Sequence, residues 1–136
     1  MAVPLARALV AAEEPVLQAH QVSMWGYVVL TALAEQPVRT QAALAQSIGA
    51  DKSRIIAVLD ELQERGLIQR RPDPADRRVH LLSLTEEGSR LRESVRDAIQ
   101  RQEEQRVLAM LPDADRAAFI RALQVLSALP PEDMRA

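Results

Sequence analysis

Apolar residues recur along most of the chain at spacings of three and four residues, which is the pattern of amphipathic helices. The segment 52–65 shows it most clearly, since Ile55, Leu59 and Leu62 form one apolar stripe. Two shorter segments, 67–71 and 79–84, instead have the length and the residue types of β-strands. The pattern therefore predicts a mostly α protein with one small β-hairpin.

Capping residues and prolines mark the expected boundaries of six helices. Short polar side chains that can accept a hydrogen bond from a backbone N–H stand before the second to sixth helices, at Ser23, Thr40, Asp51, Thr85 and Asp113. Gly49 and Gly66 follow the third and fourth helices, where a left-handed residue commonly ends a helix. Pro15 lies inside the first helix, which we expect to kink or restart there because proline has no N–H to donate.

The third and fourth helices are short and are joined at Gly49, which predicts a helix-turn-helix. The hairpin follows it, around a turn of prolines and aspartates at residues 72–76. The formal net charge of the chain is −2, but residues 65–80 contain five arginines against two aspartates, a local charge of +3. A helix-turn-helix followed by a basic hairpin is a winged helix, a DNA-binding arrangement.

The segment from about Ser23 to Gly88 also resembles a named family, the MarR family of bacterial transcription regulators. The most specific matches are "ERGLI" at residues 64–68, Asp76-x-Arg78, and the Leu-Thr pair at residues 84–85. The segment 111–126 is similar to the closing dimerisation helix of that family. The chain departs from the family pattern at residues 56 and 57, which are Ile and Ala where Thr and Arg often stand, so the base preference of the family does not transfer.

The resemblance implies a division of the chain into three parts. Residues 1–22 are expected to form an N-terminal helix of a dimerisation region, and residues 23–88 the winged helix-turn-helix domain. Residues 89–136 are expected to form a long linking helix and a C-terminal dimerisation helix. The implied protein is a homodimeric transcription regulator that binds a pseudo-palindromic operator in double-stranded DNA, as a repressor that a small-molecule effector releases.

Candidate DNA contacts follow from the physics of both grooves. On the hairpin, Arg78 is the candidate to enter the minor groove, and Asp76 can hold its guanidinium in place by two hydrogen bonds. The candidates for phosphate contacts are Arg70, Arg71 and Arg77. The start of the fourth helix is expected in the major groove, with Arg54 able to contact guanine, Ser53 a base or a phosphate, and Lys52 a phosphate.

Three residues near the junction of the first two helices, His20, Trp25 and Tyr27, are candidates for an effector site. The resemblance implies a crevice there that can hold small aromatic or anionic molecules. The alternative is that both aromatic residues pack in the core or an interface and that His20 lies at the surface.

The composition argues against several other classes of protein. The chain has no cysteine, and its two histidines stand in no recognisable ligand motif, so we expect no metal site and no cofactor. It has only four glycines, no phosphate-binding glycine loop and no nucleophile motif, so we do not expect an enzyme. Since no membrane span or secretory signal is evident, the expected location is the cytoplasm.

Two other interpretations stay open at this point. The first is a winged-helix module that binds proteins and no DNA, which the negative net charge favours. The second is a small-molecule carrier or an enzyme built around the helical crevice. Binding to duplex DNA that weakens with salt distinguishes the DNA-binding regulator from both, because neutralised phosphates release counterions.

Overall fold

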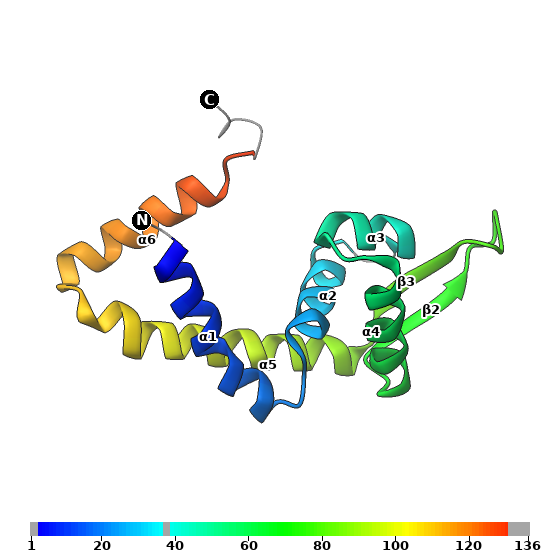
Figure 1. Cartoon of the computed structure of the whole chain (residues 1–136), viewed down its shortest axis with the longest axis horizontal. Coiled ribbons are helices and arrows are strands. Elements are labelled where there is room, and N and C mark those ends of the chain that lie inside the picture. Colours follow the sequence, from blue (N-terminus) through cyan, green and yellow to red (C-terminus); the bar gives the residue numbers. More distant parts are fainter. Residues whose placement is uncertain (1–2, 37–38, 131–136) are drawn as a thin grey trace. The chain divides into compact units, whose positions relative to one another are not determined.

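A computed structural model describes residues 3–36 and 39–130. In chain order, its main elements are α1 (Val3–Ala19), α2 (Met24–Glu35), β1 (Arg39–Thr40), α3 (Gln41–Ile48), α4 (Lys52–Glu64), β2 (Ile68–Pro72), β3 (His80–Leu84), α5 (Glu86–Gln102) and α6 (Asp113–Ser127) (Figure 1). The chain divides into two compact units between Ile99 and Gln100. The predicted fold class, mostly α with a β-hairpin, is confirmed.

Local hydrogen bonds place most of the helix boundaries where the sequence predicts them. The cap oxygens of Ser23, Thr40, Asp51 and Thr85 accept backbone N–H groups three residues ahead at 3.0, 3.1, 2.8 and 3.0 Å. Gly49 and Gly66 have φ values of +70° and +73°, the left-handed conformation that ends a helix. These six boundary predictions are confirmed.

Two predictions about helix boundaries differ from the structure. Of the expected kink or restart at Pro15, the restart does not occur, because helix α1 runs through this residue. Both Pro15 and Ala11, whose carbonyl would otherwise accept the N–H that proline lacks, are exposed, so water can satisfy that carbonyl. Asp113 does not cap α6, because Pro112 occupies the cap position and Asp113 is the first helical residue. The Asp113 carboxylate lies 3.3 Å from the Arg116 guanidinium one turn later.

The sheet has three antiparallel strands in the order β1-β3-β2, one more than the sequence predicts. Strands β2 and β3 form the predicted hairpin, with Ile68 opposite Leu84 and Pro72 opposite His80 (Figure 1). The extra strand β1 is two residues long and pairs Thr40 with Leu81. A two-residue strand has no detectable alternation, and its pairing to β3 links the start of α3 to the hairpin.

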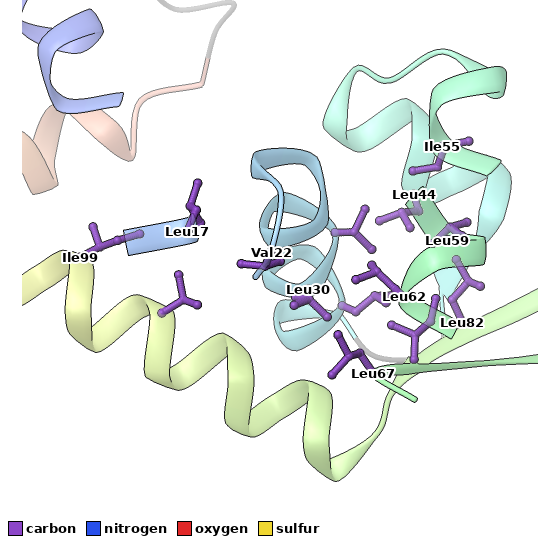
Figure 2. Close-up of a cluster of buried hydrophobic side chains, with 14 residues drawn as sticks. Leu17, Val22, Leu30, Leu44, Ile55, Leu59, Leu62, Leu67, Leu82 and Ile99 are labelled. Atoms are coloured by element: carbon purple, nitrogen blue, oxygen red, sulfur yellow. The ribbon is translucent and has the colours of Figure 1, made fainter. Parts of the chain in front are cut away.

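The core of the first unit joins α1, the helix-turn-helix, the hairpin and α5. Its fully buried members include Leu30, Leu44, Leu59 and Leu82, together with Leu17 from α1 and Val95 from α5. Figure 2 shows Leu17 and Ile99 at one end of this cluster, Leu44, Leu59 and Leu62 at the other, and Leu30 of α2 between them. The buried stripe of α4 is the predicted one, Ile55, Leu59 and Leu62. Packing through this stripe leaves the opposite face of α4 to solvent.

The start of α5 approaches the start of β2 closely. Thr85 donates its hydroxyl to the carbonyl of Gly66 at 2.6 Å while it caps α5. A Cβ atom on the buried Gly88 would lie 2.0 Å from the carbonyl oxygen of Leu67, far inside contact distance. Glycine is therefore required at this position by close approach of the backbone, which anchors α5 at the base of the hairpin.

The second unit consists of helical turns and α6. A π-helical turn (Glu103–Val107) and a 3-10 turn (Leu108–Met110) follow α5, and Arg116 on α6 donates to the carbonyls of Leu108 and Leu111 at 3.0 and 3.3 Å. In the single chain, the apolar residues Leu123, Val125 and Leu126 of α6 are exposed. Within residues 3–36 and 39–130, no helix has the length and hydrophobicity to cross a membrane.

Candidate nucleic-acid interface

The first turn of α4 carries three exposed polar side chains and is held by the capping residue Asp51. Asp51 accepts the backbone N–H of Arg54 at 2.8 Å and the hydroxyl of Ser53 at 2.9 Å. These two hydrogen bonds, the backbone one first, lower the pKa of Asp51 below its ordinary value. Lys52, Ser53 and Arg54 are all exposed. The three predicted major-groove residues therefore lie together on an ordered helix N-terminus.

Arg54 has a partner that the sequence does not indicate. Its guanidinium carbon lies 5.6 Å from the centre of the Trp25 ring, at the start of α2. This distance suits a cation–π contact, which orients the guanidinium without using its hydrogen-bond donors. Arg54 can thus keep its donors for a base or a phosphate while Trp25 restrains the side chain.

The hairpin tip is a compact loop held by its own backbone. Asp73 donates its N–H to the carbonyl of Val79 at 2.8 Å, and Val79 donates to the carbonyl of Asp76 at 2.9 Å. The Asp73 carboxylate also accepts the N–H of Ala75 at 2.9 Å. The aspartates at this turn therefore shape the backbone, as the composition of the segment 72–76 predicts.

Asp76 and Arg78 form the predicted pair at this tip. The Arg78 side chain donates from Nε to Asp76 Oδ1 at 3.2 Å and from Nη2 to Oδ2 at 3.4 Å. The backbone N–H of Arg78 also donates to Oδ1 at 3.1 Å. The Arg78 side chain, and after it the Arg78 N–H, lower the pKa of Asp76. The predicted pairing is confirmed, and the Arg78 side chain is still 91% exposed.

The other hairpin arginines lie in different surroundings. Arg70 on β2 donates to Asp60 and, at 2.6 Å, to Gln63, both on α4, and its side chain is only 20% exposed. Arg70 thus joins the hairpin to α4, and two of its donors are engaged within the protein. Arg71 donates to Gln69 at 2.7 Å, and both Arg71 and Arg77 are exposed. A phosphate contact by any of the three stays a prediction.

A groove of about 550 Å³ lies between α4 and the hairpin. Its lining includes Lys52 and Ile56 from α4, Gln41 from α3, and Arg78 and His80 from the hairpin. The structure therefore brings the start of α4 and the hairpin tip, which are more than twenty residues apart in sequence, to one surface. Ile56 and Gln41 belong to this surface although the sequence alone does not single them out as contacts.

A separate cavity of about 660 Å³ lies among α1, α2 and α3. Of the three predicted effector residues, Tyr27 lines it, while His20 and Trp25 are not among its lining residues. His20 instead hydrogen-bonds through Nδ1 to the carbonyl of Val16 at 2.8 Å. The lining residues on α2 that were not predicted from the sequence include Met24, Thr31 and Glu35. With Tyr27 they recur every three or four residues, so one helical face could have identified them.

Comparison with known proteins agrees with this geometry. The MarR family model matches residues 22–80, which include the helix-turn-helix and most of the hairpin. The PcaV transcriptional regulator of Streptomyces coelicolor, solved in complex with its natural ligand, is 32% identical to the chain. That match covers 90% of this chain and 89% of PcaV, with a TM-score of 0.66. The chain belongs to the MarR family.

Two further MarR-type matches bear on the interface. The transcriptional repressor CouR, known from Rhodococcus jostii, was solved on a 23-mer DNA duplex. It is 28% identical over 93% of this chain and 92% of its own, with a TM-score of 0.74. A protein named for transcriptional regulation of the hcr operon of Thauera aromatica is 37% identical over 74% of the chain. The chain spans 60% of the length of that relative and 41–48% of the next curated ones.

The described part of this MarR chain offers no metal centre. Among residues 3–36 and 39–130, no three His, Asp or Glu side chains stand close enough together to hold a metal ion. Two carboxyl groups have lowered pKa values because each accepts hydrogen bonds from nearby groups, Asp51 at the start of α4 and Asp76 at the hairpin tip. Asp51 thereby holds the first turn of α4, and Asp76 holds Arg78.

Proposed function

We propose that this MarR-family chain is a homodimeric, sequence-specific DNA-binding regulator that represses transcription until a small-molecule effector releases it. The main observation is the exposed Arg78, held by Asp76 at the tip of a hairpin that shares one groove with Lys52 of α4. A pre-oriented guanidinium loses less entropy on binding than a free one. The proposal involves no catalysed reaction, and in bacteria, where the relatives occur, it places the chain in the cytoplasm with the DNA.

The proposed binding mode assigns one groove of DNA to each element. The first turn of α4, with Lys52, Ser53 and Arg54, enters the major groove, and Arg78 enters the neighbouring minor groove. Arg71 and Arg77 contact phosphates, and Arg70 steadies the hairpin against α4 with its remaining donors available to the backbone of the DNA. The solved complex of CouR with a 23-mer DNA duplex supports duplex DNA as the partner for a chain of similar fold.

The experiment that tests DNA binding is a fluorescence anisotropy titration of labelled duplexes from the region upstream of the gene, at two salt concentrations. Affinity should fall as salt rises, because Lys and Arg displace counterions from phosphates. Arg78→Ala should weaken binding, whereas Arg96→Ala, which removes an exposed arginine from the middle of α5, should not. Absence of salt-dependent binding to any duplex, including a random pool, would favour a protein-interaction module instead.

Dimerisation is proposed through the helices outside residues 23–88. On α1, Val3, Leu5 and Val10 are exposed in the single chain, and on α6 Leu123, Val125 and Leu126 are exposed. Large apolar side chains grouped on one element usually mark an interface. A two-fold dimer of this kind would present two α4 helices to a pseudo-palindromic operator.

The effector is proposed to be a small aromatic molecule in the cavity among α1, α2 and α3. The described lining contains the carboxylates of Glu13 and Glu35 and no basic side chain, which disfavours an anion there. The cavity has the size of ordinary small-molecule sites, and Tyr27 supplies an aromatic wall. Thr31, which also lines it, has a buried hydroxyl oxygen with no hydrogen-bond partner among the described residues. A bound ligand would satisfy that hydroxyl, since buried polar groups are normally paired. The ligand-bound structure of PcaV supports effector binding in a similar chain.

A panel of small aromatic molecules, with and without a carboxyl group, tests the effector proposal by two readouts. An effector should raise the melting temperature of the free protein and release labelled DNA in the anisotropy assay, because it binds one of two states more tightly. Thr31→Val should reduce both effects while preserving DNA binding. A molecule that releases DNA equally from wild type and Thr31→Val would place the effector elsewhere.

A further inference from the structure

The recognition helix α4 has one large apolar side chain on its solvent face. Ile56 is 44% exposed, whereas Ile55, Leu59 and Leu62 of the same helix are at most 2% exposed. Ile56 is neither a member of the buried core nor one of the partly buried residues packed against it. Its neighbour Ala57 is exposed as well, so the surface at this point of α4 is formed by methyl groups.

Polar and charged groups surround this apolar surface. Lys52 lies one turn before Ile56, and both residues line the groove that Arg78 reaches from the hairpin. Asp60, one turn after Ile56, is bound to Arg70, so its negative charge is paired. A polyanion that follows the cations Lys52 and Arg78 would therefore pass directly over Ile56.

The major groove of DNA offers one apolar group to such a side chain. The 5-methyl group of thymine projects into the major groove, and aliphatic side chains contact it there. Isoleucine cannot hydrogen-bond to a base edge, so a guanine or cytosine beside it would lose water without gaining a partner. Ala57 adds a second, smaller methyl surface next to it.

We propose that Ile56 is a specificity-determining residue that contacts thymine methyl groups in the major groove of the operator. The inference rests on the proposed DNA-binding function and extends it by naming the base that this part of α4 selects. The exposed face of α4 is proposed to bind duplex DNA and not a second copy of the chain, because the cations Lys52 and Arg78 flank the apolar surface. The groove between α4 and the hairpin then holds the adjacent phosphates.

The test replaces each thymine of a selected operator in turn by deoxyuridine, which keeps every hydrogen bond and removes only the methyl group. The operator is first obtained by selecting tight binders from random duplexes with the full chain. At one or two thymines, the wild type should lose about four-fold in affinity, the value expected for one buried methyl group. The variant Ile56→Ala should bind more weakly and should no longer distinguish thymine from deoxyuridine at those positions.

Two control variants separate this role from a general loss of binding. Ile56→Val keeps a branched side chain and should keep most of the discrimination. Arg78→Ala should weaken binding to the thymine duplex and to the deoxyuridine duplex equally. The ratio of these two affinities should therefore stay at the wild-type value. Thermal melting should confirm that Ile56→Ala folds, as expected for an exposed helix position.

Three outcomes would overturn the proposal. The first is a wild type that binds every deoxyuridine duplex as tightly as the parent operator, and the second is an Ile56→Ala variant that keeps the full discrimination. A change of oligomeric state in Ile56→Ala by light scattering would assign the apolar surface to an interface between copies. Failure of the wild type to bind any duplex in a salt-dependent manner would contradict the proposed function itself, and it is distinguishable from the other outcomes.

Discussion

The guanidinium carbon of Arg54 lies 5.6 Å from the centre of the Trp25 ring, so the start of the recognition helix contacts the start of α2. Met24 and Tyr27, on either side of Trp25 in sequence, line the cavity proposed for the effector. The first turn of α2 is therefore common to a proposed DNA contact and the proposed effector site. The contact between Arg54 and the Trp25 ring offers a direct way to follow Arg54 in solution.

Trp25 is the only tryptophan of the chain, so tryptophan emission arises from this position alone. Binding of a duplex should draw the Arg54 guanidinium toward the DNA and change the emission of Trp25. The measurement is a fluorescence titration of unlabelled duplex into wild type and Arg54→Met. An equal change in Arg54→Met would show that the signal does not arise from the Arg54 contact.

The pairing of Asp76 with Arg78 predicts that removing the negative charge of Asp76 weakens DNA binding. Arg78→Ala should reduce operator affinity by about 1–3 kcal/mol without affecting the fold. Asp76→Ala should also reduce it, because Arg78 loses its restraint, although the variant is more positive. Anisotropy titrations of both variants test this, with Glu93→Ala, an exposed acid on α5, as the charge-matched control. Tighter operator binding by Asp76→Ala would contradict the proposed restraint.

The pKa of Asp76 is lowered first by the Arg78 side chain and then by the Arg78 N–H, which predicts a specific pH range for the pair. A carboxyl group with a lowered pKa stabilises the folded state at pH values above its unfolded pKa of 3.8. That contribution is lost as the pH falls through the lower, folded pKa. The pair should thus stay intact at neutral pH. A carboxyl NMR titration should place the Asp76 midpoint below 3.8 in wild type and higher in Arg78→Ala.

The close approach of Gly88 to Leu67 predicts a large effect of one added methyl group. Gly88→Ala should destabilise the fold by about 1–3 kcal/mol or more, since backbone atoms must move to relieve the overlap. Urea unfolding measures this change, and Ser89→Ala, at the exposed neighbouring position, should leave the free energy of unfolding almost unchanged. An unchanged unfolding midpoint in Gly88→Ala would show that α5 does not pack against Leu67 as described.

The exposed apolar face of α6 predicts a dimer that one charge can disrupt. Wild type should have the mass of a dimer by light scattering at micromolar concentration. Leu126→Glu, at a position 57% exposed in the single chain, should shift the mass toward that of a monomer, because a buried unpaired carboxylate is costly. Leu126→Met serves as the apolar control. A monomeric wild type would rule out dimerisation.

Much of the local geometry of this chain follows from residues a few positions apart. The caps at Ser23, Thr40 and Asp51 each bind an N–H three residues ahead, and Asp76 binds Arg78 two residues ahead. Such contacts depend on residue type and spacing, which the sequence states directly. The same is true of the apolar stripe of α4, because helical periodicity alone places it on one face.

Contacts between distant segments could not be predicted in this way. Arg70 meets Asp60 on another element, Trp25 lies under Arg54, and β1 pairs with β3. Each depends on the angles at which the helices and strands pack, and no short-range pattern encodes those angles. The uninterrupted passage of α1 through Pro15 likewise depends on whether water reaches the freed carbonyl.

The sequence by itself therefore determined the helices, the hairpin, the pairing of Arg78 with Asp76 and the family to which the chain belongs, since all of these rest on local spacing. Only the tertiary structure decided that Arg70 attaches the hairpin to α4, that Gly88 is required by close packing and that Ile56 shares a groove with Arg78 of the hairpin. The physical reason is that burial and close approach are properties of packed surfaces, which form only when segments far apart in the chain meet.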